Sequence, residues 1–240
     1  MEEIKTVQPL LSDVDSQVLK SNVEQVLKTL DENRWQNQAP AKLIAVTKTV
    51  APSVINQFKE LGILDIGENR AQVALPKLPE IAPEFRLHWI GRLQTNKVKD
   101  IIDTVCMLHS LDRIELAREV DRRARQHGRI IPALVQVNIA GEEQKGGMPA
   151  QEVEGFLREM RNYPNIHVEG LMAIMPLGAA EDELDRLFGE MRSLFDQMRE
   201  KNIEGVEMRE LSMGMSNDYR IAARNGATMV RVGTALYRHG

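Results

Sequence analysis

The stretch Leu43-Ile44-Ala45-Val46-Thr47-Lys48 joins a short apolar run to a lysine. An apolar run of this length, flanked by polar residues, is typical of a buried strand. Seven further apolar runs follow along the chain: Leu64–Ile66, Leu87–Ile90, Val105–Leu108, Pro132–Val137, Val168–Ile174, Glu210–Met213 and Met229–Val232. The sequence therefore predicts eight strands.

Segments with helical spacing separate these runs. The segment from Leu184 to Met198, for example, repeats apolar residues at intervals of three and four. Strands that alternate with helices indicate parallel β-α units. Eight units in 240 residues fit an α/β fold with a single (β/α)8 TIM barrel, and an open doubly wound sheet is the alternative. We expect residues 1–240 to form one domain, with an amphipathic N-terminal helix within about residues 10–36.

Composition excludes several classes of protein. The net charge of -4 and the pI of about 5.8 argue against a basic surface for nucleic acid. No apolar run reaches the roughly 18 residues of a membrane span. The single cysteine, Cys106, has no partner for an internal disulfide, and the polar N-terminus is unlike a secretory signal. We therefore expect a cytoplasmic protein that binds neither nucleic acid nor membrane.

Lys48 is the first candidate functional residue. It follows the first predicted strand at its C-terminal end, where barrels place their active sites. A lysine is rare at the end of a buried strand, and desolvation would lower its pKa and make the amine able to form an imine. The alternative is a lysine that simply leaves the barrel for solvent.

The last two predicted strands end in glycine and hydroxyl residues. Ser212-Met213-Gly214-Met215-Ser216 follows the seventh strand, and Gly233-Thr234 follows the eighth. Barrels commonly bind phosphate in these two loops, through backbone N–H groups and hydroxyls. The alternative is a pair of ordinary turns. Arg231 shares a strand face with Gly233 because side chains alternate along a strand. If Gly233 faces the phosphate, Arg231 points into the barrel. The alternative is that Arg231 lies on the outer face of the barrel and pairs with an acidic side chain of a helix.

Other residues have simpler interpretations. His88 and His109 lie on predicted strands without a cluster of further metal ligands, so we expect no metal site, and His88 fits a hydrogen-bonded core histidine. Cys106 fits a small buried side chain. Four methionines are expected to pack in the core and around a pocket: Met172, Met175, Met213 and Met215.

Several blocks in order resemble the signature of the pyridoxal phosphate homeostasis protein family. The resemblance extends from about residue 12 to residue 237, and only the C-terminal Leu236–Gly240 departs from it by lacking Phe-Gly. The blocks are Ala45–Lys48, Ile66–Arg70, His88–Lys97, His109–Asp112, Val137–Ile139, Gly170–Met172, Leu211–Ser216 and Val230–Thr234.

The resemblance implies a fold-type III barrel that binds pyridoxal 5'-phosphate (PLP), like the N-terminal domain of alanine racemase. It implies that Lys48 forms the Schiff base and that Arg231 lies near the pyridine nitrogen, which the arginine would keep unprotonated. It also implies that Ser212, Gly233 and Thr234 form the phosphate cup and that Asn69 lines the pocket. The further contacts that it implies are Met213, Gly214, Met215 and Ser216. Lys145 is either a secondary contact or a solvated loop lysine.

Two functions are compatible with these residues. The first is a PLP carrier without catalytic residues, which acts as a monomer, maintains intracellular vitamin B6 balance and passes PLP to apo-enzymes. The second is a PLP-dependent amino-acid racemase. Racemisation needs acid–base groups on both faces of the cofactor. Lys48 would supply one, whereas Tyr163 and Tyr219 are poorly placed to supply the other, and no second domain follows the barrel. The sequence therefore favours the carrier.

Overall fold

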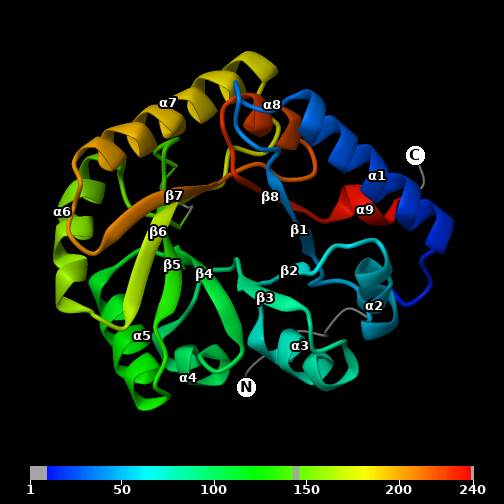
Figure 1. The fold of residues 1–240 in the computed structure, drawn as a ribbon, viewed down its shortest axis with the longest axis horizontal. Helices are drawn as coiled ribbons and strands as arrows, with labels where there is room; N and C mark the ends of the chain where they lie inside the picture. The colour runs from blue at the N-terminus through cyan, green and yellow to red at the C-terminus, as the bar shows by residue number, and fades with distance from the viewer. Residues whose placement is uncertain (1–9, 143–145, 239–240) are drawn as a thin grey trace, which may run out of the picture.

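The computed structural model describes residues 10–142 and 146–238, and its strands form a closed barrel (Figure 1). The strands are β1 (Lys42–Val46), β2 (Asp65–Glu68), β3 (Arg86–Trp89), β4 (Val105–Leu111), β5 (Ile131–Val137), β6 (Ile166–Ala173), β7 (Val206–Ser212) and β8 (Met229–Val232). Each strand pairs in parallel with the next, and β8 pairs with β1 to close the barrel. The predicted barrel is thus confirmed over the open doubly wound sheet.

Helices surround the barrel in Figure 1. They are α1 (Ser16–Glu32), α2 (Pro52–Glu60), α3 (Ala71–Ala74), α4 (Val98–Ile101), α5 (Ile114–Gln126), α6 (Val153–Glu159), α7 (Glu181–Glu200), α8 (Tyr219–Arg224) and α9 (Thr234–Tyr237). Each long helix buries an apolar stripe against the strands, as α7 does with Leu187, Phe188 and Met191. None of the helices that the structure describes is long and apolar enough to cross a membrane.

The N-terminal helix α1 lies outside the β-α repeat. It is shorter than the stretch 10–36 that the sequence indicated, because the side chain of Asp15 caps its start by accepting from the N–H groups of Gln17 and Val18. Its buried face contains Leu19, Val23, Val26 and Leu30. Figure 1 shows α1 beside α8 and α9, so it covers the outside of the barrel near β8 and β1.

Strand β7 begins four residues before the apolar run that predicted it, at Val206 instead of Glu210. In the first half of β7 the polar Glu207 and Arg209 alternate with apolar residues, and Arg209 forms an ion pair with Glu169 of β6 at 2.7 Å. An apolar run therefore marks only the buried end of the strand. The polar end forms through backbone pairing with β6, which an apolar pattern does not report.

A β-bulge in β6 fixes the register of the strands beside it. Against β5 the pairing shifts by one residue at Glu169, since Val168 pairs with Ala133 and Gly170 with Leu134. Against β7 it shifts by two, since Val168 pairs with Val206 and Gly170 with Glu210. Gly170 has φ of 152°, and a Cβ atom added there would lie 1.8 Å from the carbonyl oxygen of Glu210. The bulge is therefore possible only with glycine at this position.

We predict that Gly170→Ala destabilises the protein by at least about 4 kcal/mol, because the added methyl group overlaps the backbone of β7. Gly155→Ala is the matched control: Gly155 lies in α6 with open space around it, so alanine should stabilise the protein by roughly 0.5–1 kcal/mol. Urea unfolding followed by circular dichroism measures both changes. A loss below about 1 kcal/mol for Gly170→Ala would show that β6 and β7 can separate without this constraint.

Candidate functional site

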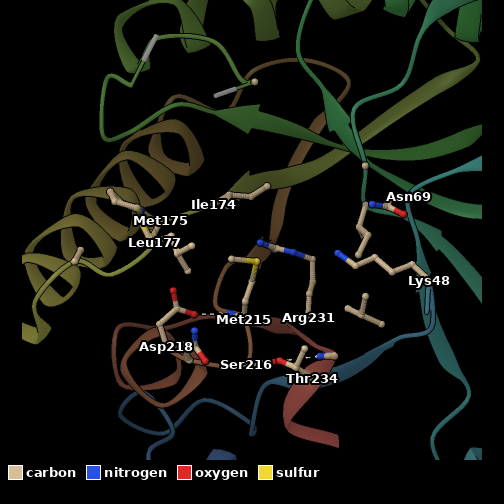
Figure 2. A pocket seen from close by; sticks show the side chains of 18 of the residues that line it. Lys48, Asn69, Ile174, Met175, Leu177, Met215, Ser216, Asp218, Arg231 and Thr234 are labelled. Carbon is tan, nitrogen blue, oxygen red and sulfur yellow. Dashed lines mark hydrogen bonds between the residues drawn. The ribbon is translucent and has the colours of Figure 1, made fainter. Parts of the chain in front are cut away.

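A cavity of about 670 Å³ opens at the C-terminal ends of the strands, the end where barrels bind ligands. Its volume lies within the range typical of small-molecule sites, roughly 300–1,000 Å³. Side chains and backbone from the loops after several strands line it (Figure 2). Among them are the following residues that the sequence singled out: Lys48, Asn69, Met215, Ser216, Arg231, Gly233 and Thr234.

Lys48 lies two residues beyond the end of β1. Figure 2 shows its amine and the Arg231 guanidinium directed toward the same space. No hydrogen bond or ion pair within the described part of the chain involves this amine. The expectation that Lys48 is desolvated is wrong, since its side chain is exposed on the open side of the cavity. Lys48 is thus an accessible primary amine at the cavity wall.

The buried Lys77 and the partly buried Tyr237 fix the backbone from which Lys48 extends. The Tyr237 hydroxyl donates to the carbonyl of Val46 at 2.9 Å, and Lys77 Nζ donates to the carbonyl of Thr47 at 2.8 Å. Lys77 also forms a buried ion pair with Glu68 at 3.0 Å. Sequence reasoning missed Lys77, although a lysine within Leu75-Pro76-Lys77-Leu78-Pro79 is an unusual cation in an apolar segment.

The loops after β7 and β8 are joined by Ser216. Its Oγ accepts hydrogen bonds from the N–H groups of Gly233 at 3.1 Å and Ala235 at 3.3 Å. Thr234 lies between these two residues and is exposed at the cavity. Two backbone donors and two hydroxyl residues therefore gather in the place where the sequence predicted a phosphate site.

Asp218 holds the loop that carries Ser216. Its Oδ1 accepts from the N–H of Met215 at 2.5 Å, just before α8 begins. Burial raises the pKa of this carboxyl group, which is partly offset by its backbone hydrogen bond and by the charge of Arg231. Asp218 therefore has a structural partner although it lines the cavity.

Arg231 is buried and points into the barrel, so the alternative of an outer-face arginine is wrong. It donates from Nη1 to Ser212 Oγ at 2.6 Å and from Nη2 to the carbonyl of Ala173 at 2.8 Å. Burial lowers the pKa of Arg231 to about 10, which leaves it protonated at neutral pH. The guanidinium is thus a fixed cation at the bottom of the cavity.

Three residues of the predicted phosphate loop do not line this cavity. Ser212 lies beneath it, in contact with Arg231, and Met213 is fully buried. Gly214 has φ of 92°, and a Cβ atom there would lie 2.5 Å from that of Ala222, so this glycine lets the chain turn against α8. Their role as direct ligand contacts stays a prediction.

Asn69 and Gly91 shape the opposite wall. The Asn69 Oδ1 atom is buried and has no hydrogen-bond partner within the described chain. A Cβ atom on Gly91 would lie 2.6 Å from the Asn69 Cβ, so only glycine fits at position 91 beside Asn69. An unpaired buried acceptor is costly, which indicates that a ligand donor completes it.

Sequence reasoning missed part of the cavity lining. Gln136 of β5 and the segment 174–179 after β6 line it, and of these only Met175 was expected near a pocket. Both follow from their place near the C-terminal ends of strands. Lys145 lies outside the described residues. No group of three potential metal ligands occurs within the described ranges. The Cys106 thiol is partly buried, and desolvation raises its pKa to about 12.

Comparison with known proteins defines the class of barrel first. Residues 14–239 match the alanine racemase N-terminal domain. The solved alanine racemase of Clostridium difficile 630 has a TM-score of 0.77 at 15% identity, covering 98% of this chain and 60% of that protein. At this identity the likeness concerns the fold alone.

Closer relatives narrow the class. A pyridoxal phosphate homeostasis protein of Aquifex aeolicus is 38% identical over 219 residues, or 90% of this chain and 95% of the relative. PipY of Synechococcus elongatus PCC7942, solved without PLP, is 30% identical with a TM-score of 0.84, covering 92% of this chain and all of PipY. PipY has also been solved with PLP bound, with a TM-score of 0.81. The chain belongs to the pyridoxal phosphate homeostasis protein family.

We predict that Lys77→Met lowers the free energy of unfolding by roughly 3–5 kcal/mol, because it leaves the buried Glu68 carboxylate without its cation. Lys59→Met is the matched control: Lys59 pairs with Glu84 at 2.8 Å, but both are exposed, so the loss should stay below about 1 kcal/mol. Chemical denaturation measures both. Equal losses would contradict a special role for the buried pair.

Proposed function

We propose that this protein binds PLP reversibly and serves as a carrier that maintains the intracellular supply of this cofactor. The observation that carries the proposal is the accessible Lys48 amine, which shares one cavity with the buried Arg231 cation and the donors around Ser216. Membership of the pyridoxal phosphate homeostasis family and the PLP complex of PipY support the proposal.

The residues of the cavity fit the chemical groups of PLP. Lys48 would hold the aldehyde carbon as a Schiff base. Ser216, Gly233 and Thr234 would bind the phosphate, because backbone N–H groups and hydroxyls are suited to an anion and glycine permits a close approach. Asn69 offers the unpaired acceptor that a ligand donor would satisfy.

Arg231 would face the pyridine nitrogen. When bound, PLP supplies a reactive aldehyde and a ring that withdraws electrons most strongly when its nitrogen is protonated. A guanidinium cannot give up its proton at neutral pH, so it donates a hydrogen bond and leaves that nitrogen unprotonated. Arg231 would therefore favour binding and orientation of the cofactor over stabilisation of a carbanion.

The cavity lining also favours a carrier over a racemase. Its titratable side chains within the described chain are Lys48, Arg92, Asp218 and Arg231. Asp218 is engaged by the N–H of Met215, and the Tyr237 hydroxyl donates to the Val46 carbonyl. Two-face acid–base chemistry needs a second group beside the lysine, and no tyrosine of the described chain lines this cavity. We therefore assign no catalytic residue.

An exposed lysine suits exchange of the cofactor. Water reaches the Lys48 amine from the open side of the cavity, so a Schiff base there can hydrolyse and release PLP. Apo forms of PLP-dependent enzymes are the partners that would accept it. A carrier of this kind needs a stable phosphate site and a reversible covalent bond, and the cavity offers residues for both.

We predict that Lys48→Ala abolishes covalent attachment of PLP and the absorbance band near 420 nm that it produces, because no other amine of the described chain lines the cavity. Lys42→Ala is the control, since Lys42 lies at the opposite end of β1. Borohydride reduction followed by peptide mapping identifies the modified lysine. Attachment to another lysine in the wild type, with normal binding by Lys48→Ala, would exclude the assignment.

We predict that turnover of common amino acids stays well below about one per second, the lower end for typical enzymes. Chiral chromatography and keto-acid release, measured with L- and D-amino acids, test racemisation and transamination. The same PLP-loaded protein should activate an added apo-enzyme. Turnover of even one amino acid at about one per second, lost in Lys48→Ala and kept in Lys42→Ala, would establish the racemase-like alternative instead.

A further inference from the structure

A continuous chain of hydrogen bonds leads from Arg231 through the interior of the barrel. Arg231 donates to Ser212 Oγ at 2.6 Å, and this oxygen lies 3.0 Å from His109 Nδ1. His109 Nε2 lies 2.9 Å from His88 Nδ1, and His88 Nε2 lies 2.8 Å from Asp65 Oδ1. The five side chains come from five strands, β8, β7, β4, β3 and β2.

All five side chains are buried. His109 and Ser212 have no exposed surface, and His88, Arg231 and Asp65 have at most 5%. They share the barrel interior with an apolar cluster formed by Ile44, Met107, Leu134, Met172 and Met229. Barrel interiors are usually filled with branched apolar side chains, so a polar row of this length is costly unless each group is paired.

The Asp65 carboxylate at the end of the row determines which atom donates in each hydrogen bond of the row. Burial raises the pKa of Asp65, but the hydrogen bonds of His88 and Arg86 outweigh it and lower this pKa to about 2. Asp65 is therefore ionised and only accepts, so His88 donates from Nε2, and a His88 with a single proton offers its Nδ1 as an acceptor.

The donor and acceptor atoms of His109 and Ser212 follow in the same way. Burial lowers the pKa of His109 well below its usual value and the charge of Arg231 lowers it further, so this histidine is neutral and has one N–H. That N–H lies on Nε2 and points to His88, so Nδ1 accepts from the Ser212 hydroxyl. The Ser212 oxygen in turn accepts from Arg231. If His88 carried two protons instead, its Nδ1 would donate to His109 Nε2, and His109 would donate from Nδ1 to Ser212 Oγ. The Ser212 hydroxyl could then no longer donate to His109.

Arg231 forms no direct ion pair within the described chain; its neutral partners are Ser212 and the Ala173 carbonyl. A carboxylate in contact with the guanidinium would compete for the N–H groups that face the cavity. The charge of Asp218 acts on Arg231 without an ion pair, and the hydrogen-bonded row ends in the Asp65 carboxylate, four hydrogen bonds away. The row thus polarises Ser212 toward the cation while leaving the cavity side of Arg231 available for a ligand.

We propose that Ser212, His109, His88 and Asp65 are positioning residues, which hold the Arg231 guanidinium in one orientation toward the ring nitrogen of PLP. This inference rests on the proposed function for the identity of the ligand. It gives Ser212 a role beneath Arg231 and not at the phosphate. It also gives both histidines a task that a merely packed core histidine does not have.

The first test uses the protein without added PLP. Nitrogen-15 NMR reports which ring nitrogen of each histidine carries a proton. We expect His109 protonated on Nε2 and bare on Nδ1. Asp65→Asn replaces the carboxylate with an amide that can also donate, so it should allow the opposite tautomer of both histidines to appear. Asp185→Asn, at a surface carboxylate paired with Arg224, is the control and should change neither histidine. The opposite tautomer of His109 in the wild type would overturn the proposal.

The second test compares PLP with its analogue in which carbon replaces the ring nitrogen. Ser212→Ala should weaken PLP binding roughly tenfold, because the bond from Arg231 to the nitrogen loses its fixed geometry. Binding of the analogue should change by less than about twofold, since it offers no acceptor to Arg231. Ser212→Thr retains the hydroxyl and should restore PLP binding.

The two tests separate the possible failures. Equal losses for PLP and the analogue in Ser212→Ala would mean that Ser212 only supports packing, which overturns the proposal. A wild-type protein that fails to bind PLP would refute the proposed function. The histidine tautomers would then still decide whether the chain exists, because that measurement needs no cofactor.

Discussion

The pairing of β8 with β1 is the interaction on which the site depends. Ile44 lies beside Arg231 and Ala45 beside Val232 in this register. The closure therefore brings Lys48 at the end of β1 next to Gly233 and Thr234 at the end of β8, although nearly the whole chain lies between them. A shift of this register by one residue would turn Arg231 out of the barrel, because side chains alternate along a strand. The same pairing thus sets the positions of both the Lys48 amine and the Arg231 cation at the cavity.

Buried charges give the site its rigidity. Arg231, Lys77 and Glu68 are each at most 3% exposed, and an unpaired buried charge would cost several kcal/mol. Each is compensated differently: Lys77 and Glu68 by each other, and Arg231 by neutral acceptors and by the charge of Asp218. These arrangements stabilise one geometry more than they stabilise the fold, since apolar residues could fill the same space. The backbone around Lys48 is fixed in this way, while the amine itself is accessible.

The division between fixed backbone and open cavity also suits this racemase-type barrel to the carrier function that we propose. The alanine racemases share the fold at low identity, and function in such barrels depends on the residues at the ends of the strands. Here those residues offer an amine, a cation and anion donors, and the tyrosine at the end of the barrel is committed to the Val46 carbonyl. The chemistry that they support is capture and release of an aldehyde.

The sequence by itself determined the eight strands, the barrel, the helix before it and several of the residues that line the cavity, Lys48 and Arg231 among them. It could do so because short apolar runs report burial, and because strand ends in a barrel meet at one face. The motif blocks in the sequence also indicated the family. Only the tertiary structure decided that Lys48 is exposed, that Lys77 pairs with Glu68, and that Ser212 lies under Arg231. The row from Asp65 to Arg231 joins five strands that are distant in sequence. Hydrogen bonds between such residues depend on distances of a few ångströms, and these are set by barrel closure and register, which no local pattern contains.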